Sequence, residues 1–432
     1  MKVMAKSKTA NKTAWFVQDR FGMFIHWGLY ALAARHEWVK RNEKIPTAEY
    51  NKYFEHFNPD LFNPREWARL AKGAGMKYFV ITAKHHEGFC LWDTKHTAFK
   101  ATNTPYGRDV LKQVIEAFRE EGLKVGVYYS LLDWHHPDFT VDKHHPMRDN
   151  PEERKKNEQR QMPRYAAYMR NQVKELLTNY GKIDIIWYDF SYPGEDGKGR
   201  ADWESEKLYD LICKLQPEIM VDNRLDLEGV GDFVTPEQFQ PAAPLLDKED
   251  KPVVWEGCQT FSGSWGYHRD ELTWKSTDLL IRMLVDGVSK GGNLLLNIGP
   301  TGRGELDYRA RERLEGIGQW MRLNSRSIYG CGPAPDGLVA PPDCRYTYNP
   351  VTNRLYLHVF AWPFRNIFSP GLSPERVEYA QFLHDASEVL FKPVAEASWN
   401  GLGRHLKKDI CAFQVPIVKP PVDVPVIELF LK

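Results

Sequence analysis

A carboxylate at the end of a buried strand is the residue in this chain best placed for chemistry. The run Ile183–Asp189 is largely apolar, and after Phe190 the chain breaks into Ser191-Tyr192-Pro193-Gly194. Alternation along a strand places Trp187 and Asp189 on the same side, so the carboxylate lies beside an aromatic wall. This pairing suits a charged nucleophile that faces a sugar ring, whereas a strand-end aspartate that only caps the next helix would not need the indole.

Two glutamates compete as the second carboxyl group that a glycosidase needs. Retaining enzymes place one carboxylate below the anomeric carbon and one acid above the leaving oxygen, about 5–5.5 Å apart. Glu237 follows Thr235-Pro236, where the fixed φ of proline stiffens the approach. Glu256 follows Trp255 at the end of a predicted strand, a rigid mount for catalysis, but a buried Glu256 would equally well hold Arg224 or a histidine in place. The residues alone leave both glutamates open.

Further polar and aromatic side chains are expected around these carboxylates. Neutral histidine, tyrosine, tryptophan and arginine side chains bind hydroxyl groups and stack on a pyranose without any cofactor. The ends of the predicted strands and the segments that follow them contain side chains of these kinds, among them His26, Trp38, His85, His86, Tyr128, Trp187, Arg224 and Trp265, and Glu37 lies on the first long loop. A small neutral sugar is the ligand that this set favours.

A metal centre is the alternative that the histidine pairs suggest. His85-His86 and His135-His136 are imidazole pairs of the kind found in metal sites. Adjacent side chains on an extended segment diverge, so each pair would supply one inward ligand at most, and no His-x-His or His-Glu-x-x-His spacing occurs. We therefore expect no metal and no cofactor.

Strand-like and helix-like runs alternate in the part of the chain that carries these residues. The predicted strands are Phe21–His26, Tyr78–Ala83, Lys124–Ser130, Ile183–Tyr188, Ile219–Asp222, Phe233–Thr235, Val253–Trp255 and Asn293–Ile298. The predicted helices are Pro64–Ala74, Val110–Glu121, Arg164–Asn179, Trp203–Leu215 and Thr277–Val288. Eight strands in a β/α repeat predict an α/β fold of the (β/α)8 TIM-barrel type, in which active sites lie at the carboxyl ends of the strands.

The pattern changes after the stretch Gly330–Pro335, which marks a domain boundary. Beyond it, turn residues separate short β-like runs: Arg354–Phe360, Glu388–Leu390 and Pro425–Leu431. We expect a catalytic barrel over residues 1–332 and a C-terminal antiparallel β-sandwich over residues 333–432.

Charge and composition narrow the partners. The 58 Lys and Arg residues nearly balance the 57 Asp and Glu residues, so no net field attracts nucleic acid or an anionic membrane. The start of the chain has no apolar leader and the six cysteines form no Cys-x-x-Cys pair, so we expect a cytoplasmic protein with reduced thiols. Trp362 and Trp399 in the tail leave contact with a second copy, in a homo-oligomer, open.

Six stretches resemble the α-L-fucosidases of glycoside hydrolase family 29, in order and with similar spacing over about residues 15–330. They are Phe24-Ile25-His26-Trp27-Gly28, Lys84-His85-His86-Glu87-Gly88-Phe89-Cys90-Leu91-Trp92, Gly126-Val127-Tyr128-Tyr129-Ser130, Trp187-Tyr188-Asp189, Trp265-Gly266-Tyr267 and Gly291-Gly292-Asn293-Leu294-Leu295-Leu296-Asn297. The resemblance implies a barrel followed by a sandwich, and metal-free hydrolysis of terminal α-L-fucosides with retention. Its substrates are fucosylated oligosaccharides or glycoconjugates.

The resemblance also assigns roles to residues. It makes Asp189 the nucleophile and places the nine binding candidates around the fucose. It favours Glu237 as the general acid and base, in a Thr-x-Glu context, with Glu256 as the alternative. A non-catalytic fucose-binding protein and a metal-dependent barrel hydrolase remain the other two hypotheses. The retention of both candidate carboxylates argues against the binding protein.

Overall fold

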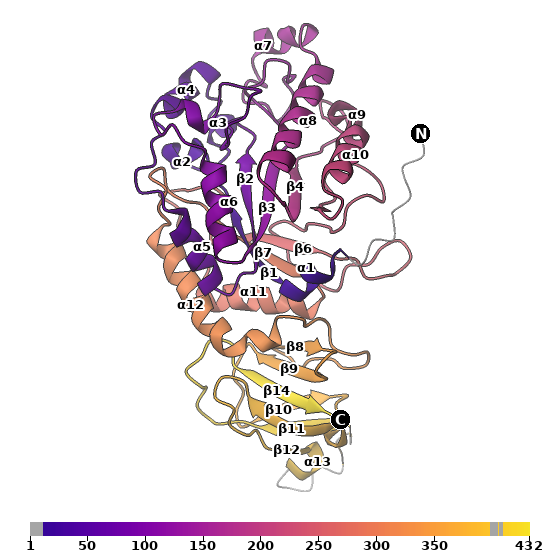
Figure 1. Cartoon of the computed structure of the whole chain (residues 1–432). Coiled ribbons are helices and arrows are strands. Elements are labelled where there is room, and N and C mark those ends of the chain that lie inside the picture. Colours follow the sequence, from indigo (N-terminus) through magenta and orange to yellow (C-terminus); the bar gives the residue numbers. More distant parts are fainter. Residues whose placement is uncertain (1–11, 398–404, 406–408) are drawn as a thin grey trace.

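The computed structural model describes residues 12–397, 405 and 409–432, which form an α/β barrel followed by a smaller β-rich part (Figure 1). The predicted leaderless start of the chain, residues 1–11, and Trp399 lie outside the described residues. No helix within the described part of the chain combines the length and the apolar content that a membrane span requires.

A curled parallel sheet forms the barrel wall. Within the described residues it has seven strands in the order β5-β4-β3-β2-β1-β7-β6. Their bounds are β1 Phe21–Ile25, β2 Tyr78–Lys84, β3 Lys124–Ser130, β4 Ile185–Asp189, β5 Met220–Val221, β6 Glu256–Thr260 and β7 Asn293–Ile298. The pairing of β3 with β4 sets Tyr128 beside Trp187 and Ser130 beside Asp189. The carboxyl ends of these strands therefore bring the predicted site residues to one edge.

The eighth strand is reduced to isolated bridges. Phe233 pairs with Asp222 after β5, Val234 pairs with Trp255, and Glu237 pairs with Cys258 of β6. These parallel bridges join the two edges of the sheet, so the segment 233–237 takes the place of a strand. The segment predicted as the strand Phe233–Thr235 is therefore not a regular strand, because it pairs with its neighbours at single residues only.

The predicted strand Val253–Trp255 is wrong in its position. The strand of this region, β6, begins at Glu256, directly after the predicted one. Val253 and Trp255 lie before β6 and form only single backbone hydrogen bonds with neighbouring segments. All five residues of β6 are buried. A run that mixes Glu, Gln and Thr carries no apolar signal, which explains the displacement.

Helices surround the barrel wall. They are α1 (Ala14–Asp19), α2 (Tyr30–Ala33), α3 (Val39–Asn42), α4 (Thr47–Glu55), α5 (Pro64–Gly73), α6 (Val110–Glu120), α7 (Pro151–Lys155), α8 (Met162–Asn179), α9 (Arg200–Trp203), α10 (Ser205–Leu215), α11 (Thr277–Ser289) and α12 (Tyr308–Asn324). Asn63 caps α5 by accepting the Glu66 N–H, with Pro64 at the first helical position. The predicted helix Trp203–Leu215 is divided at Glu204, whose φ is 47°.

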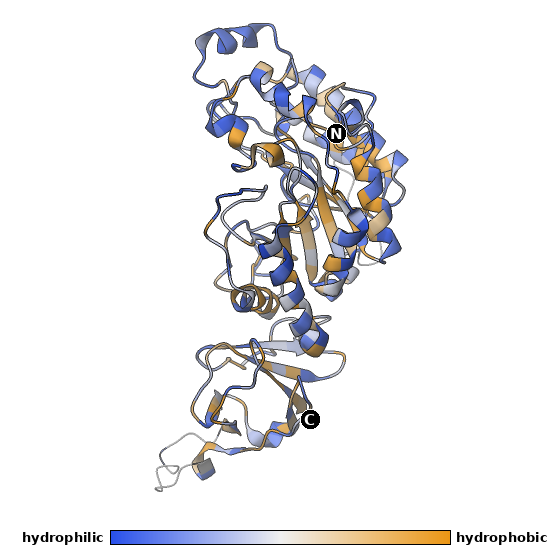
Figure 2. Cartoon of the chain, turned by 90° about the vertical axis from the view of Figure 1, so that its left-hand side faces the viewer, coloured by the Kyte–Doolittle hydropathy of each residue, from blue (hydrophilic) through white to orange (hydrophobic). Residues whose placement is uncertain are grey.

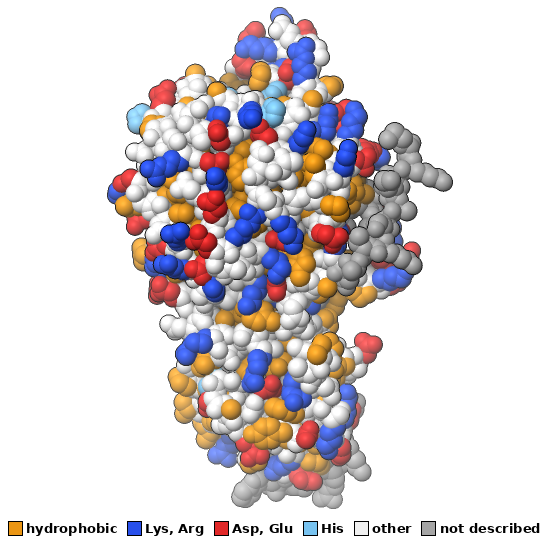
Figure 3. Space-filling view, in the orientation of Figure 1, with side chains coloured by type: hydrophobic (Ala, Val, Ile, Leu, Met, Phe, Trp, Pro, Cys, Tyr) orange, Lys and Arg blue, Asp and Glu red, His pale blue; other side chains and the backbone are white. Residues whose placement is uncertain are grey.

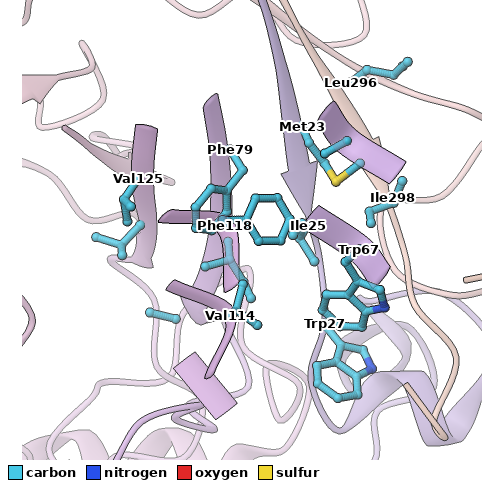
Figure 4. Packing of buried hydrophobic residues seen from close by; sticks show 14 of the residues in the cluster. Met23, Ile25, Trp27, Trp67, Phe79, Val114, Phe118, Val125, Leu296 and Ile298 are labelled. Carbon is cyan, nitrogen blue, oxygen red and sulfur yellow. The ribbon is translucent and has the colours of Figure 1, made fainter. Parts of the chain in front are cut away.

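Alternation along the strands separates two apolar layers. Met23, Ile25 and Phe79 face outward and pack under α5 and α6, where the rings of Phe79 and Phe118 lie 4.0 Å apart (Figure 4). The alternate residues of the same strands, such as Phe24, fill the barrel interior. Figure 2 shows apolar residues concentrated on the strands and hydrophilic ones on the outer helices. The inward layer forms the floor of the candidate site.

The described residues of the C-terminal part form two antiparallel sheets. One has the order β11-β14-β9-β8 and the other β10-β13-β12. The bounds are β8 Cys344–Asn349, β9 Arg354–Val359, β10 Asn366–Pro370, β11 Val377–Phe382, β12 Phe391–Pro393, β13 Ile410–Gln414 and β14 Val426–Leu431, with α13 at Val394–Ala397. A shared apolar core confirms the predicted sandwich. The predicted strand Glu388–Leu390 is wrong, because Glu388 makes only an isolated bridge and β12 begins at Phe391.

The surface carries charges of both signs, and one glycine permits close packing beside a strand. On the face in Figure 3, positive and negative side chains are interspersed. Gly292 serves strand packing, because a Cβ atom there would come within 2.3 Å of the Trp255 ring. The Gly291-Gly292 turn therefore lets β7 pack closely against the segment before β6.

Candidate active site

A cavity of about 100 Å³ opens at the carboxyl ends of the barrel strands. It is lined by Phe24, His26, Trp38, His85, His86, Tyr128, Trp187, Asp189, Phe190, Glu237, Cys258 and Trp265. Nine of the eleven residues predicted for catalysis or binding, Glu237 among them, are thus lining residues. Arg224 contacts two of the lining carboxylates, and Glu37 lies behind the wall.

Asp189 is held by two donors. The Tyr128 hydroxyl donates to Oδ2 over 2.8 Å, and Nη1 of Arg224 donates to Oδ1 over 2.6 Å. The guanidinium lies flat against the aromatic wall, with its Cζ 4.4 Å from the centre of the Trp187 ring. Hydrogen bonds to both oxygens of a carboxylate fix its direction. Asp189 is therefore held facing the cavity, next to the indole that alternation predicted.

Glu237 meets the same arginine from the other side. Nη2 of Arg224 lies 2.8 Å from Oε2 of Glu237, so one guanidinium holds both carboxylates. Removal from water and then the charge of Asp189 raise the pKa of Glu237 above its ordinary value, while Arg224 lowers it. The Glu237 side chain is 40% exposed, so water screens part of this shift. A carboxyl group with a raised pKa at the mouth of the cavity suits proton donation.

His26 is a neutral imidazole with a defined tautomer. Burial lowers its pKa to about 3. Nδ2 of Asn297 donates to the carbonyl of Trp265, which fixes the amide so that its Oδ1 faces Nδ1 of His26 at 2.6 Å. An amide oxygen only accepts, so Nδ1 carries the proton and Nε2 presents a lone pair.

His86 has the same tautomer for a different reason. Its Nδ1 lies 2.6 Å from Oγ of Ser130, which donates its own proton to the carbonyl of Leu132. The hydroxyl therefore accepts from Nδ1, and Nε2 of His86 is an acceptor 3.8 Å from Oδ2 of Asp189. Burial holds the pKa of His86 well below the ordinary value, so the ring is uncharged.

His85 joins these two rings, contrary to the expectation that adjacent histidines diverge. The chain turns after β2 instead of staying extended, and the rings of His85 and His86 lie 4.0 Å apart. The Nδ1 atom of His85 is buried without a hydrogen-bond partner. His135 and His136 lie elsewhere, against Phe99 and against tyrosines of α8.

Glu37 acts on the wall of the cavity. Its Oε2 accepts the backbone N–H groups of Trp265 at 3.0 Å and Gly266 at 2.9 Å. Burial raises the pKa of Glu37 above its ordinary value. In this structure Glu37 therefore orients Trp265, whose ring centre lies 5.1 Å from that of His26. Trp38 follows it and forms the rim with Phe190, at a ring distance of 5.1 Å.

Glu256 lies away from the cavity. It is the first residue of β6, at the amino end of the strand, and not at a carboxyl end as expected. Its side chain is fully buried, and the Tyr78 hydroxyl is hydrogen-bonded to Oε2. The sequence placed it wrongly because β6 begins later than the apolar run suggested. Among the described residues, no cluster of three or more His, Cys, Asp and Glu side chains has the arrangement of a metal site.

Sequence reasoning missed residues that support the site. Asn297 and Ser130 set the histidine tautomers, and both were quoted only within family-like stretches at strand ends. Cys258 lines the cavity without any chemical signal in an otherwise ordinary strand. Phe190 adopts φ 78°, a conformation that is unfavourable for a bulky residue and occurs directly after Asp189. Nothing in the sequence indicates that conformation.

Comparisons with known proteins agree on one family. The sequence profile described as alpha-L-fucosidase matches residues 2–326. The structure of α-L-fucosidase isoenzyme 1 from Paenibacillus thiaminolyticus is 46% identical, with a TM-score of 0.91 over 98% of this chain and 99% of that chain. Plasma α-L-fucosidase from Homo sapiens is 30% identical over 81% of this chain and 76% of that protein.

A third similar protein bears on the reaction course. It is a GH29 α-L-fucosidase from Bacteroides thetaiotaomicron, solved as a trapped covalent intermediate in complex with 2-fluoro-fucosyl fluoride. It is 28% identical, with a TM-score of 0.83 over 98% of this chain and 97% of that chain.

Proposed function

The chain belongs to the α-L-fucosidases of glycoside hydrolase family 29, and from this we propose that Asp189 and Glu237 carry out its hydrolysis. The protein is a retaining glycoside hydrolase, and its substrates are fucosylated glycans with a terminal α-L-fucosyl group. The observation that carries the assignment is the shared arginine: Arg224 holds Asp189 through Nη1 and Glu237 through Nη2.

The reaction proceeds by two displacements. Oδ of Asp189 attacks the anomeric carbon and forms a β-linked fucosyl ester, while the Glu237 carboxyl group gives its proton to the departing glycosidic oxygen. Glu237 then takes a proton from water, which attacks the same carbon, breaks the ester bond and regenerates the Asp189 carboxylate. Two inversions leave the α anomer of fucose.

The walls of the cavity support recognition of fucose. Nε2 of His26 and Nε2 of His86 are lone-pair acceptors, so they accept hydrogen bonds from hydroxyl groups of the sugar. Phe24, Trp187 and Trp265 supply apolar rings, with 5.3 Å between Phe24 and Trp187 and 5.9 Å between Phe24 and Trp265. Such rings suit the methyl group that fucose carries where other hexoses carry a hydroxymethyl group.

Turnover of an aryl α-L-fucoside, before and after treatment with EDTA, tests the proposal. We expect equal rates, and NMR of the first-formed sugar should show α-fucose. Asp189→Gly should lose several orders of magnitude in rate while the variant still folds and binds substrate. Azide should restore turnover of that variant with an activated fucoside, giving the β-fucosyl azide by a single inversion.

The outcomes separate the competing hypotheses. Absence of turnover with retained fucose binding would indicate a binding protein, and loss of turnover with EDTA would indicate a metal-dependent hydrolase. Turnover of Asp189→Gly at the wild-type rate would remove Asp189 from the reaction. The linkage preference is expected to reside in the polar loops 137–154 and 241–251, which a panel of fucosylated oligosaccharides would test.

A further inference from the structure

Glu256 lies one layer beneath the cavity, on its inward side. Cys258 lines the cavity, and Glu256 precedes it by two residues on the same strand, so both side chains point into the barrel. All carboxyl ends of a parallel barrel lie on one face, so a residue at the amino end of β6 is directed to the interior below that face. The side chain of Glu256 is fully buried there.

Two unpaired polar atoms meet in this interior layer. Oε1 of Glu256 and Nε1 of Trp187 are both buried, and neither has a hydrogen-bond partner of good geometry. The Trp187 indole is nevertheless close enough to the Glu256 carboxyl to lower its pKa. A buried indole N–H or carboxyl oxygen without a partner destabilises the folded protein. The proximity of these two atoms therefore indicates that they form a hydrogen bond with each other.

The other carboxyl oxygen is anchored from below. The Tyr78 hydroxyl is hydrogen-bonded to Oε2, and Nδ2 of Asn293 donates to the Tyr78 hydroxyl over 3.3 Å. The same Nδ2 donates to the carbonyl of Phe16 over 2.8 Å. Burial raises the pKa of Glu256 to about 8, so the folded protein favours the protonated form of this carboxyl group over a wider pH range than the unfolded chain does.

The Trp187 ring transmits this anchoring to the reacting groups. It stacks with Tyr128 at a ring distance of 5.7 Å and an angle of 23°, and the Arg224 guanidinium lies on its face. Tyr128 and Arg224 are the two donors that hold Asp189. A rotated indole would therefore displace both donors and the wall of the sugar cavity together.

We propose that Glu256 is a positioning residue: its carboxyl group binds the Trp187 indole from below, fixes the sugar-stacking wall and takes no part in proton transfer. The inference rests on the proposed function, because it takes Trp187 as a wall of the fucose cavity. It replaces the alternative in which Glu256 is the general acid.

The variants Glu256→Gln and Glu256→Leu separate the roles. Glutamine keeps one acceptor oxygen and one donor, as a neutral acid does, whereas leucine has a similar volume and keeps neither. Each variant is assayed on an α-L-fucoside of an acidic phenol and on a fucosylated disaccharide. Glu256→Gln should stay within about 3-fold of the wild-type kcat/KM on both substrates. Glu256→Leu should lose about 10–100-fold on both alike.

Three results would overturn the proposal. Selective loss of the disaccharide with Glu256→Gln would make Glu256 the acid. Equal, large losses with both variants would require a charged carboxylate. Wild-type kinetics for Glu256→Leu would show that Trp187 keeps its position without the Glu256 carboxyl group. Absence of turnover by the wild-type protein, in contrast, would count against the proposed function, and the two measurements below would still decide this inference.

The first measurement needs no turnover. In protein labelled with ¹⁵N-tryptophan, the indole N–H resonance that disappears in Trp187→Phe should be protected from exchange in wild type and Glu256→Gln, and shifted in Glu256→Leu. An unchanged resonance in Glu256→Leu would contradict the contact. If Glu256→Leu fails to fold, Tyr78→Phe loosens the carboxyl from its other side and should cause a smaller loss on both substrates.

The second measurement is stability against pH. A carboxyl group whose pKa rises from 4.5 to about 8 on folding binds more protons in the folded state across that range. Its contribution to stability therefore falls as the pH rises from 4.5 to 8, and glutamine has no such dependence. The Tm of Glu256→Gln should gain on that of the wild type between pH 5 and pH 8, and a constant difference would contradict the neutral state.

Discussion

Arg224 defines the residue scale of this site, because a single side chain sets the positions of both reacting carboxyl groups. Its two terminal nitrogens hold Asp189 and Glu237, and its Nε donates to Oγ1 of Thr235 over 2.9 Å. Arginine presents its donors in a rigid planar fork, so the two acids cannot move independently. A lysine could not replace this geometry with its single ammonium group.

Glu237→Ala should affect substrates according to their leaving groups. A fucoside with an acidic phenol departs with little protonation, whereas a sugar leaving group needs it fully. We expect natural linkages to lose much more kcat/KM than such aryl fucosides, and azide should capture the intermediate as the α-fucosyl product. In the wild type, activity should fall as the pH rises through the elevated pKa of Glu237, because only its protonated form donates.

The control for this prediction is Glu256→Gln on the same substrates. Equal slowing of both substrate types by Glu237→Ala, with no α-azide, would reject Glu237. An alkaline limb of the pH profile that persists in Glu237→Gln would show that another group supplies the proton.

The tautomer of His26 gives a second prediction at this scale. Asn297→Leu removes the acceptor that fixes the Nδ1 proton, so Nε2 is no longer held as a lone pair, and kcat/KM should fall about 10–100-fold. Asn297→Asp places a carboxylate beside the ring and should raise the pKa of His26, which ¹⁵N NMR would detect. Asn297→Leu is also assayed with monodeoxy fucosides. The analogue that lacks the hydroxyl group donating to Nε2 should show no further loss of kcat/KM in this variant.

Elements that combine a strong pattern with a defined end were predictable from the sequence. Alternation placed Trp187 and Asp189 together at the end of β4, and the predicted bounds of α5 and α11 agree with the structure to within a residue. The apolar runs of β1, β2, β3 and β7 are buried throughout or nearly so and read correctly as barrel strands. The residues at their carboxyl ends consequently appeared in the cavity.

The remaining elements depend on tertiary contacts that no local pattern records. β6 is buried although it reads Glu-Gly-Cys-Gln-Thr, because Glu256, Gln259 and Thr260 form hydrogen bonds with residues outside the strand: Tyr78, Phe239 and Gln238. The segment 233–237 closes the barrel through single bridges. The turn that brings His85 beside His86 depends on side chains from the neighbouring strand loop, and α12 was not predicted at all. The position of Glu256 was predicted wrongly because the sequence of β6 carries no apolar pattern.

The turn after β2 is tied to the loop after β3 by a buried ion pair. Nζ of Lys84 lies 3.1 Å from Oδ2 of Asp133, whose Oδ1 accepts the N–H groups of His135 and His136. Burial alone would raise the pKa of Asp133, but Lys84 together with His136 and His135 lowers it by more, so the pKa lies below its ordinary value. Gly88 allows the close approach, since a Cβ atom there would come within 2.3 Å of Asp133.

Asp133→Asn should destabilise the protein by about 3–5 kcal/mol, because it leaves the fully buried Lys84 without a counter-charge. Lys84→Met leaves Asp133 buried without a counter-charge and should destabilise the protein by a similar amount. The double variant should recover most of either loss, since asparagine still accepts the two loop N–H groups and methionine fills the space of lysine. Urea unfolding of all four proteins measures this cycle, and additive losses would show that the pair is not coupled.

The same double variant tests function at the scale of the element. If the Lys84–Asp133 pair only holds the turn, it affects His85 and His86 through the position of the backbone alone. The double variant should then keep the kcat/KM of the wild type to within about 10-fold. A stable double variant with a greater loss of activity would show that the charge of Lys84 itself acts on the histidines.

At the scale of the whole molecule, one apolar cluster extends from the barrel into the sandwich, which also has a core of its own. Tyr356, Leu383, Val424 and Val426 of the C-terminal part belong to the same hydrophobic cluster as the barrel helices. α11 contacts β8, and both α11 and α12 lie between the barrel and the sandwich in Figure 1. Arg345 also pairs with Asp286 of α11 over 2.8 Å. This continuity predicts that the two parts unfold together.

Trp320 of α12 is the residue on which joint unfolding should depend most. Its indole is 4% exposed, and its Nε1 donates to the carbonyl of Val424 over 3.1 Å. Trp320→Ala should cost about 3–5 kcal/mol, because it removes a large buried ring and leaves that carbonyl unpaired. Arg345→Met, which removes only a half-buried ion pair at the same interface, should cost about 0–1 kcal/mol. Calorimetry should show a single transition for wild type and Arg345→Met, with a lowered Tm or a split transition for Trp320→Ala; two transitions in the wild type would mean that the sandwich folds independently of the barrel.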